Sequence, residues 1–118
     1  MSRSWEETQR AAEGTAAALR REAEAARAQA QAGRARAAAL RAVAEANRRE
    51  AEVSPDEYFA AARRHHGAMA EQQARGVERQ ADQAEEEAHR ADTEAEVAGA
   101  RAGEARSRSF GEGLPGQR

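Results

Sequence analysis

Three histidines and a run of carboxylates are the residues of this chain best suited to chemistry. His65 and His66 are adjacent, so on a helix they point about 100° apart and cannot hold one metal ion as histidines four residues apart can. His89 lies more than 20 residues further along the chain. We therefore expect a surface histidine pair and no metal site within one chain.

The acidic residues cluster between positions 82 and 96. Paired carboxylates perform acid–base catalysis only where a pocket sets their pKa values apart, so on a helix surface we expect a solvated face. The sequence contains no cysteine and no lysine, which excludes a thiol nucleophile, a lysine Schiff base and a phosphate-loop lysine. We expect a non-enzymatic protein with no cofactor and no small-molecule substrate.

One short segment is densely basic and has aromatic residues one turn before it. The basic residues are Arg63, Arg64, His65 and His66, and the aromatic residues are Tyr58 and Phe59. Arginine binds phosphate and aromatic rings stack on bases, so the segment predicts nucleic-acid binding as an alternative function. Because the net charge is -2, a solvated basic patch is the simpler interpretation.

The composition favours helix over disorder. Leu, Ile, Val and Phe together number only nine of 118 residues, a proportion typical of disordered chains. However, 34 residues are alanine, the strongest helix former, and charges of both signs are interspersed.

The use of arginine and no lysine suggests a GC-rich bacterial genome. No apolar run is long enough for a signal peptide or a membrane span, so we expect a cytoplasmic protein.

Small residues in the second half alternate at spacings of three and four, the pattern of a coiled-coil seam. They are Gly67, Ala70, Ala74, Val77, Ala81, Ala84, Ala88, Ala91, Ala95, Ala98, Ala102 and Ala105. The first half repeats every seven residues, with Ala16, Ala23, Ala30, Ala37, Ala44 and Ala51 at position a. Position e carries Arg20, Arg27, Arg34, Arg41 and Arg48, and position c carries Ala18, Ala25, Ala32, Ala39 and Ala46.

The chain is expected to break once, at Pro55. Ser54 can cap a new helix with Pro55 at its first position, and proline disfavours helical backbone at the preceding residue. One long helix kinked at Pro55 is the alternative. With a capping box at Ser4 and Glu7, the sequence predicts an N-terminal cap over residues 1–4, a helix over 5–52, a turn over 53–55, a helix over 55–106 and a disordered tail over 107–118.

The short turn predicts an all-α fold, a long antiparallel two-helix coiled-coil hairpin with an alanine-rich seam. With the turn centred near Val53, facing seam residues should have numbers that sum to about 107, which sets Leu40 against Gly67 and Ala30 against Val77. The expected ion pairs are Arg41 with Glu71, Arg34 with Glu78, Arg27 with Glu85, Arg20 with Asp92, and Glu6 with Arg106. Arg48 and Arg64 should clash beside the turn.

A seam of alanine buries little apolar area, so we expect the hairpin to associate further. The alanine column at position c is the candidate surface for a second copy or a helical protein partner. The larger apolar residues near the turn are interpreted as its local core, and as a partner site if they are exposed. They are Val43, Val53, Tyr58, Phe59 and Met69. The predicted function is a structural, scaffolding or adaptor role through helix association.

Overall fold

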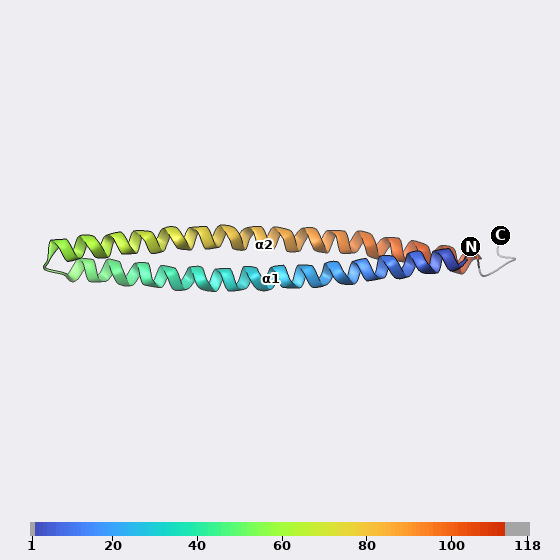
Figure 1. The fold of residues 1–118 in the computed structure, drawn as a ribbon, viewed down its shortest axis with the longest axis horizontal. Coiled ribbons are helices and arrows are strands. Elements are labelled where there is room, and N and C mark those ends of the chain that lie inside the picture. Colours follow the sequence, from blue (N-terminus) through green and yellow to red (C-terminus); the bar gives the residue numbers. More distant parts are fainter. Residues whose placement is uncertain (1, 113–118) are drawn as a thin grey trace. The chain divides into compact units, whose positions relative to one another are not determined.

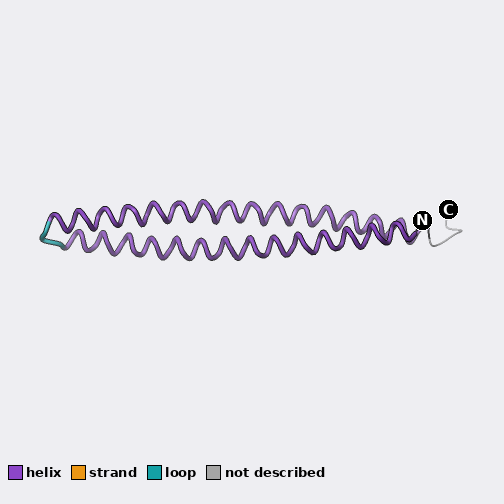
Figure 2. Tube along the Cα trace, viewed as in Figure 1, coloured by secondary structure: helices purple, strands orange, loops and turns teal. Residues whose placement is uncertain are grey.

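Two long helices joined by a short break make up the described chain. The computed structural model describes the backbone of residues 2–112 and the side chains of residues 4–108. Helix α1 spans Ser2–Val53 and helix α2 spans Glu57–Glu112 (Figure 1). Residues 54–56 form the loop between them (Figure 2). The predicted helical hairpin is therefore confirmed, and the alternative of one kinked helix is wrong.

The break is built around Asp56 rather than Ser54. The Asp56 Oδ1 atom accepts hydrogen bonds from the backbone N–H groups of Tyr58, at 2.9 Å, and Phe59, at 3.4 Å. These are the donors that an N-cap side chain satisfies. Ser54 Oγ instead accepts the N–H of Asp56 at 3.3 Å, inside the turn. The helix therefore starts after Asp56, and the turn lies one residue later than predicted.

The outer ends of both helices extend beyond their predicted limits. Helix α1 already includes Ser4, whose carbonyl accepts a hydrogen bond from Thr8 Oγ1 at 2.9 Å, so the predicted N-terminal cap at residues 1–4 is wrong. Helix α2 continues through Glu112, so residues 107–112 are helical and not part of a tail. The remaining predicted tail, residues 113–118, lies outside the described residues.

Packing divides the chain into two units, each made of two helical segments. The first unit combines Met1–Ala26 with Glu86–Arg118, of which residues 2–26 and 86–112 are described. The second unit is Arg27–Glu85 and contains the turn. Over the described residues, neither helix has a stretch long and apolar enough to cross a membrane.

Alanine fills the interior of both units. In the first unit Ala23, Ala26, Ala88 and Ala91 form one buried cluster, and in the second Ala30, Ala81 and Ala84 form another. Of the twelve seam positions in the second half, eleven are buried and only Val77 is half-buried. The apolar residues that are buried among the described side chains are all alanines. Burying alanine costs no side-chain entropy. This saving partly compensates for the small free energy gained from the little apolar area that alanine buries.

Contacts within the second unit show the helices running in opposite directions, in a register different from the expected one. A Cβ on Gly33 would lie 3.2 Å from the Ala81 Cβ, and one on Gly67 would lie 3.2 Å from the Ala44 carbonyl oxygen. The contacting numbers sum to 114 and 111, not 107, so the predicted facing of Leu40 with Gly67 is wrong. The later turn explains part of this shift, because each residue by which its centre moves adds two to the sum.

The register can be tested with cysteine pairs, since the chain has none of its own. We expect the variant Gly33→Cys/Ala81→Cys to form an intrachain disulfide rapidly in dilute oxidant, because the Cβ separation needs to open only slightly to suit a disulfide. The control Ala30→Cys/Val77→Cys, which fits a sum of 107, should stay reduced. Electrophoresis without reductant measures both, and a faster bridge in the control would contradict the register.

Two glycine substitutions test how closely the backbones approach. A Cβ on Gly14 meets nothing within 4 Å, so Gly14→Ala should raise the free energy of unfolding by about 0.5–1 kcal/mol through helix propensity. Gly67→Ala should lower it by about 1–3 kcal/mol, because the new Cβ meets a fixed helix carbonyl. Urea unfolding followed by circular dichroism measures both. A stabilising Gly67→Ala would show that the helices can separate at no cost.

Candidate partner-binding surfaces

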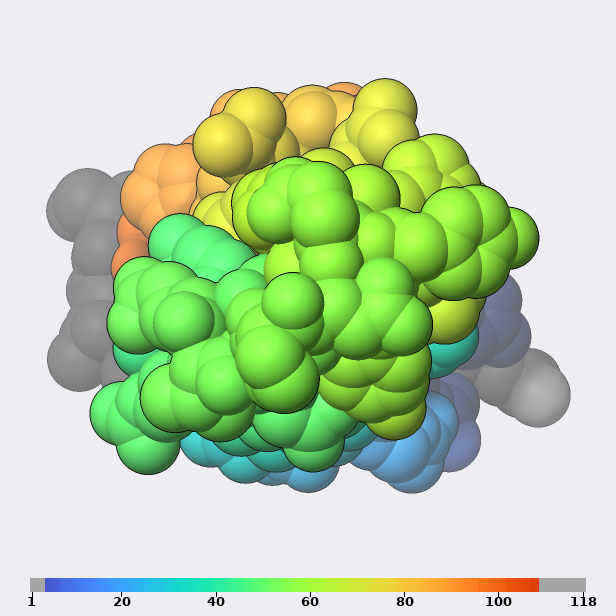
Figure 3. All heavy atoms as spheres, turned by 90° about the vertical axis from the view of Figure 1, so that its left-hand side faces the viewer, coloured from blue at the N-terminus to red at the C-terminus, as the bar shows by residue number. Residues whose placement is uncertain are grey.

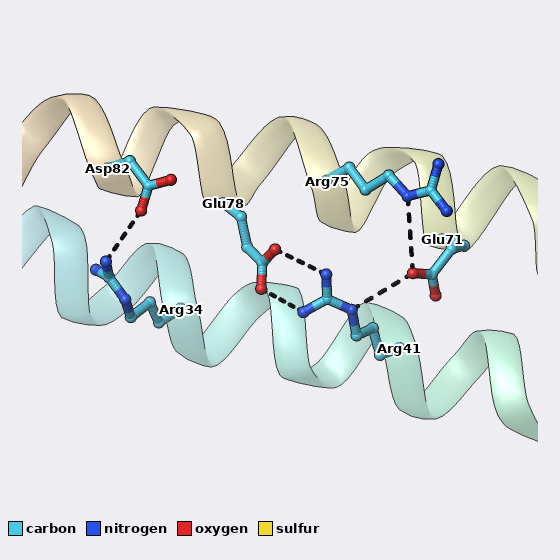
Figure 4. Close-up of polar contacts among 6 residues, drawn as sticks. All are labelled: Arg34, Arg41, Glu71, Arg75, Glu78 and Asp82. Carbon is cyan, nitrogen blue, oxygen red and sulfur yellow. Dashed lines mark hydrogen bonds and ion pairs between the residues drawn. The ribbon is translucent and has the colours of Figure 1, made fainter.

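Arg41 is the centre of an ion-pair cluster on one side of the second unit. Its two terminal nitrogens bind the two carboxylate oxygens of Glu78, with Nη2 at 2.7 Å from Oε2. Its Nε lies 3.5 Å from Glu71 Oε1, which Arg75 also approaches at 3.9 Å (Figure 4). Arg34 on the preceding heptad completes the group. Its guanidinium lies 3.1 Å from Asp82 and 2.9 Å from Glu85.

The cluster shifts the titration of its two central groups. Hydrogen bonding from Arg41 is the main cause that lowers the pKa of Glu78, although partial burial acts in the opposite direction. The same hydrogen bond raises the pKa of Arg41 above its ordinary value. Both side chains remain about two-fifths exposed. Such pairs contribute little to stability and act mainly in selecting register and partner.

Of the predicted ion pairs, Arg41 with Glu71 is present, whereas Arg34 and Arg106 each pair with a carboxylate one heptad from the predicted one. Arg41 does reach Glu71, but its closer partner is Glu78, the carboxylate that had been assigned to Arg34. In the first unit Glu13 replaces Glu6 as the partner of Arg106, at 3.0 Å. This displacement has the same direction as the change of the seam sums from 107 to 111 and 114.

The basic segment near the turn is already engaged within the chain. Arg63 Nε lies 3.0 Å from Glu50 of α1, and its guanidinium stacks 4.7 Å above the Phe59 ring. Arg64 pairs with Glu57 at 2.7 Å. The rings of His65 and His66 lie 6.1 Å apart between centroids, and both residues are exposed. The arginines of the candidate nucleic-acid segment are therefore partly neutralised by carboxylates.

Asn47 is a buried polar residue that the sequence reasoning did not single out. It is the buried polar residue of the described seam, at position d of α1. Its Nδ2 donates to the Val43 carbonyl at 3.0 Å, and its Oδ1 accepts a hydrogen bond from Arg63 at 3.4 Å. One polar residue within an apolar seam is typical of register control in coiled coils. The signal in the sequence that could have identified this residue was an asparagine at the seam position d.

The larger apolar residues near the turn do not form a local core. Tyr58 is 86% exposed and Val53 is 81% exposed, while the others are exposed by about half: Val43, Phe59 and Met69. The predicted local core is therefore wrong, because these side chains lie at heptad positions outside the seam. Figure 3 looks onto the turn, where side chains from this part of the chain, coloured green, form the surface.

The second unit has two sides that differ sharply in charge. With Gly67, Ala74 and Ala81 taken as position a of α2, the charged face comprises positions e and b of both helices, where the ion pairs of Arg34 and Arg41 lie. Of its 17 residues between 27 and 85, 13 are charged. The opposite side comprises positions g and c, where only Arg36 and Glu50 of 16 residues are charged. We call it the charge-poor face. Its residues are Gln29, Ala32, Arg36, Ala39, Val43, Ala46, Glu50, Val53, Phe59, Ala62, His66, Met69, Gln73, Gly76, Gln80 and Gln83.

Comparisons with protein-family models, curated proteins and solved structures find no match for this chain. Its function must therefore be argued from these surfaces.

The alanine column at position c remains exposed along α1. Ala18 and Ala25 belong to the first unit, and Ala32, Ala39 and Ala46 belong to the second. In the second unit this column lies beside Val43 on the charge-poor face. The exposed turn residue Val53 continues it at the same heptad position. The candidate alanine column and the exposed Phe59 and Met69 therefore belong to one surface.

A shallow groove on the charged face lies over Gly67. Its volume is about 310 Å³, and it is lined by Ala44, Arg48, Arg64, Gly67, Ala68 and Glu71. The expected clash of Arg48 with Arg64 is relieved here, because Arg48 pairs with Glu45 at 2.8 Å and Arg64 with Glu57.

Within the described part of the chain, His, Asp and Glu side chains nowhere gather in a group of three or more that could hold a metal ion.

Replacing Arg41 with Gln should raise the pKa of Glu78 toward its ordinary value, because the main donor to that carboxylate is lost. The matched control is Arg36→Gln, an exposed arginine of the same helix, which should leave the pKa of Glu78 unchanged. Carboxyl-carbon NMR titration measures both.

The same substitution has a pH-dependent effect on stability. Because the folded-state pKa of Glu78 is lowered, the ion pair stabilises the hairpin above the ordinary glutamate pKa and loses this effect as pH falls through the lowered value. The difference in unfolding between the parent chain and Arg41→Gln should therefore shrink on acidification. A difference that grows at low pH would contradict this role.

Proposed function

We propose that this chain is a non-enzymatic, cytoplasmic coiled-coil protein with a structural, scaffolding or adaptor role, which acts by associating through an outer helix face. The partner is a second copy or another helical protein. One observation carries the proposal. The buried apolar residues described are all alanines, whereas Val43, Val53, Tyr58, Phe59, Met69 and Val97 are exposed.

This distribution supports association because it reverses the usual arrangement of apolar residues. Large apolar side chains contribute most of the free energy of burial, about 25 cal/mol per Å² removed from water. In this hairpin that free energy is not gained within the chain. A cluster of exposed apolar residues on a soluble surface is typical of a protein interaction site. The candidate surface is the charge-poor face with Tyr58, which follows the turn.

Nucleic-acid binding through residues 63–66 lacks a specific observation in its favour. Arg63 and Arg64 each pair with a carboxylate, which would have to be displaced before either could bind phosphate. Phe59 is covered on one side by Arg63, so its ring is less available for base stacking.

The association can be tested by site-specific photo-crosslinking in the source cells. A benzoylphenylalanine at position 69 should give discrete adducts, because Met69 lies exposed on the charge-poor face. The control places the same group at Ala68, an exposed neighbour that belongs to the charged face. An adduct of twice the chain mass indicates self-association, and one of another mass indicates a different protein. Absence of adducts from position 69 contradicts the proposal.

A further inference from the structure

We infer that a second copy of this chain docks on the charge-poor face of the second unit, so that two hairpins form a four-helix arrangement. This inference rests on the proposed association function and identifies its partner. It concerns residues 27–53 of α1 and residues 57–85 of α2, where the two kinds of surface lie on opposite sides of the seam.

The charged face offers a partner few unpaired charges to bind. Arg34 and Arg41 are each bound to two carboxylates of α2, and these contacts lie at the surface where water solvates them further. Covering such pairs would remove that solvation, a cost that new contacts would have to offset. The charged face is therefore best left in water, and association should use the opposite side.

The charge-poor face has almost no charge to oppose a copy of itself. Its two charged residues, Arg36 and Glu50, have opposite signs, and Glu50 is already paired with Arg63. Two identical faces can therefore meet without the repulsion that like charges cause. Gln29 on α1 and Gln83 on α2 each carry both donors and acceptors, so glutamine on one copy can bond to glutamine on the other when α1 faces α2.

The sizes of the side chains on this face are also self-complementary. On α1 the column Ala32, Ala39 and Ala46 offers a low surface that recurs every seven residues. On α2 the exposed Phe59 and Met69 project instead. A two-fold axis can set α1 of one copy against α2 of the other, so that large side chains fill the spaces over alanine.

The available area matches what a stable dimer requires. Some 27 residues of each helix extend about 40 Å at 1.5 Å per residue. Two helices about 10 Å apart present a strip about 20 Å wide. The face therefore offers about 800 Å² per copy, the area that a partner contributes to a specific protein interface.

The test is the solution mass of the purified full chain by sedimentation equilibrium. The parent chain has a mass of 12.7 kDa and should sediment as a dimer. Ala39→Glu and Met69→Glu should each raise the dimer dissociation constant at least about tenfold, because each places a charge in the apolar contact. The matched controls Ala38→Glu and Ala68→Glu alter exposed neighbours on the charged face and should change it less than about twofold.

Circular dichroism of each variant distinguishes a folding defect from a loss of association. Ala39 and Met69 are exposed, so their variants should stay helical. A monomeric parent chain overturns the inference, as does an equal effect of Ala38→Glu and Ala39→Glu. If the chain is monomeric but position 69 crosslinks to another protein in cells, the second-copy inference fails and the association function stands. If it is monomeric and no adduct forms, both fail.

Discussion

Close approach of the two helix backbones is the constraint on which the rest of this hairpin depends. A Cβ on Gly67 would lie only 3.2 Å from the Ala44 carbonyl oxygen, so only glycine fits there without a shift. The buried apolar residues of this seam are alanines, so it buries little apolar area in any register. Registers that differ by one heptad place alanine against alanine in nearly the same way. Apolar burial by itself therefore specifies that the helices pair, but hardly which residues face each other.

Register is left to the few features that are not alanine. Asp56 fixes where α2 begins, and its carboxylate satisfies two backbone donors at that point. Asn47 and Arg63 join the helices near the turn, where a slip would leave a buried amide without its partner. Arg41 with Glu78, and Glu13 with Arg106, repeat the same offset within their own units. Polar contacts that contribute little to stability thus carry most of the specificity.

The two helices could be predicted from the sequence, but their register could not. Both outcomes follow from the dependence of the prediction on local signals. The heptad of alanines and the break near Pro55 are local signals, and they predicted two paired helices. Ser54 and Asp56 are both good capping residues, and the choice between them moves the turn and every facing pair. The matching of Leu40 to Gly67 assumed that large residues enter the seam. Leu40 is half-buried at its seam position, whereas Phe59 and Met69 lie outside the seam and are exposed.

The narrow seam also bears on why the two sides of the second unit differ. Arginine and glutamate on one side can reach across the narrow seam, because their long side chains span the helices while their charged ends stay in water. Apolar side chains on the same side would compete with those pairs. Val43, Phe59 and Met69 instead lie on the other side, where no ladder of arginine and glutamate crosses the seam. The thin seam thus separates a surface whose charges are paired within the chain from one whose apolar side chains stay exposed.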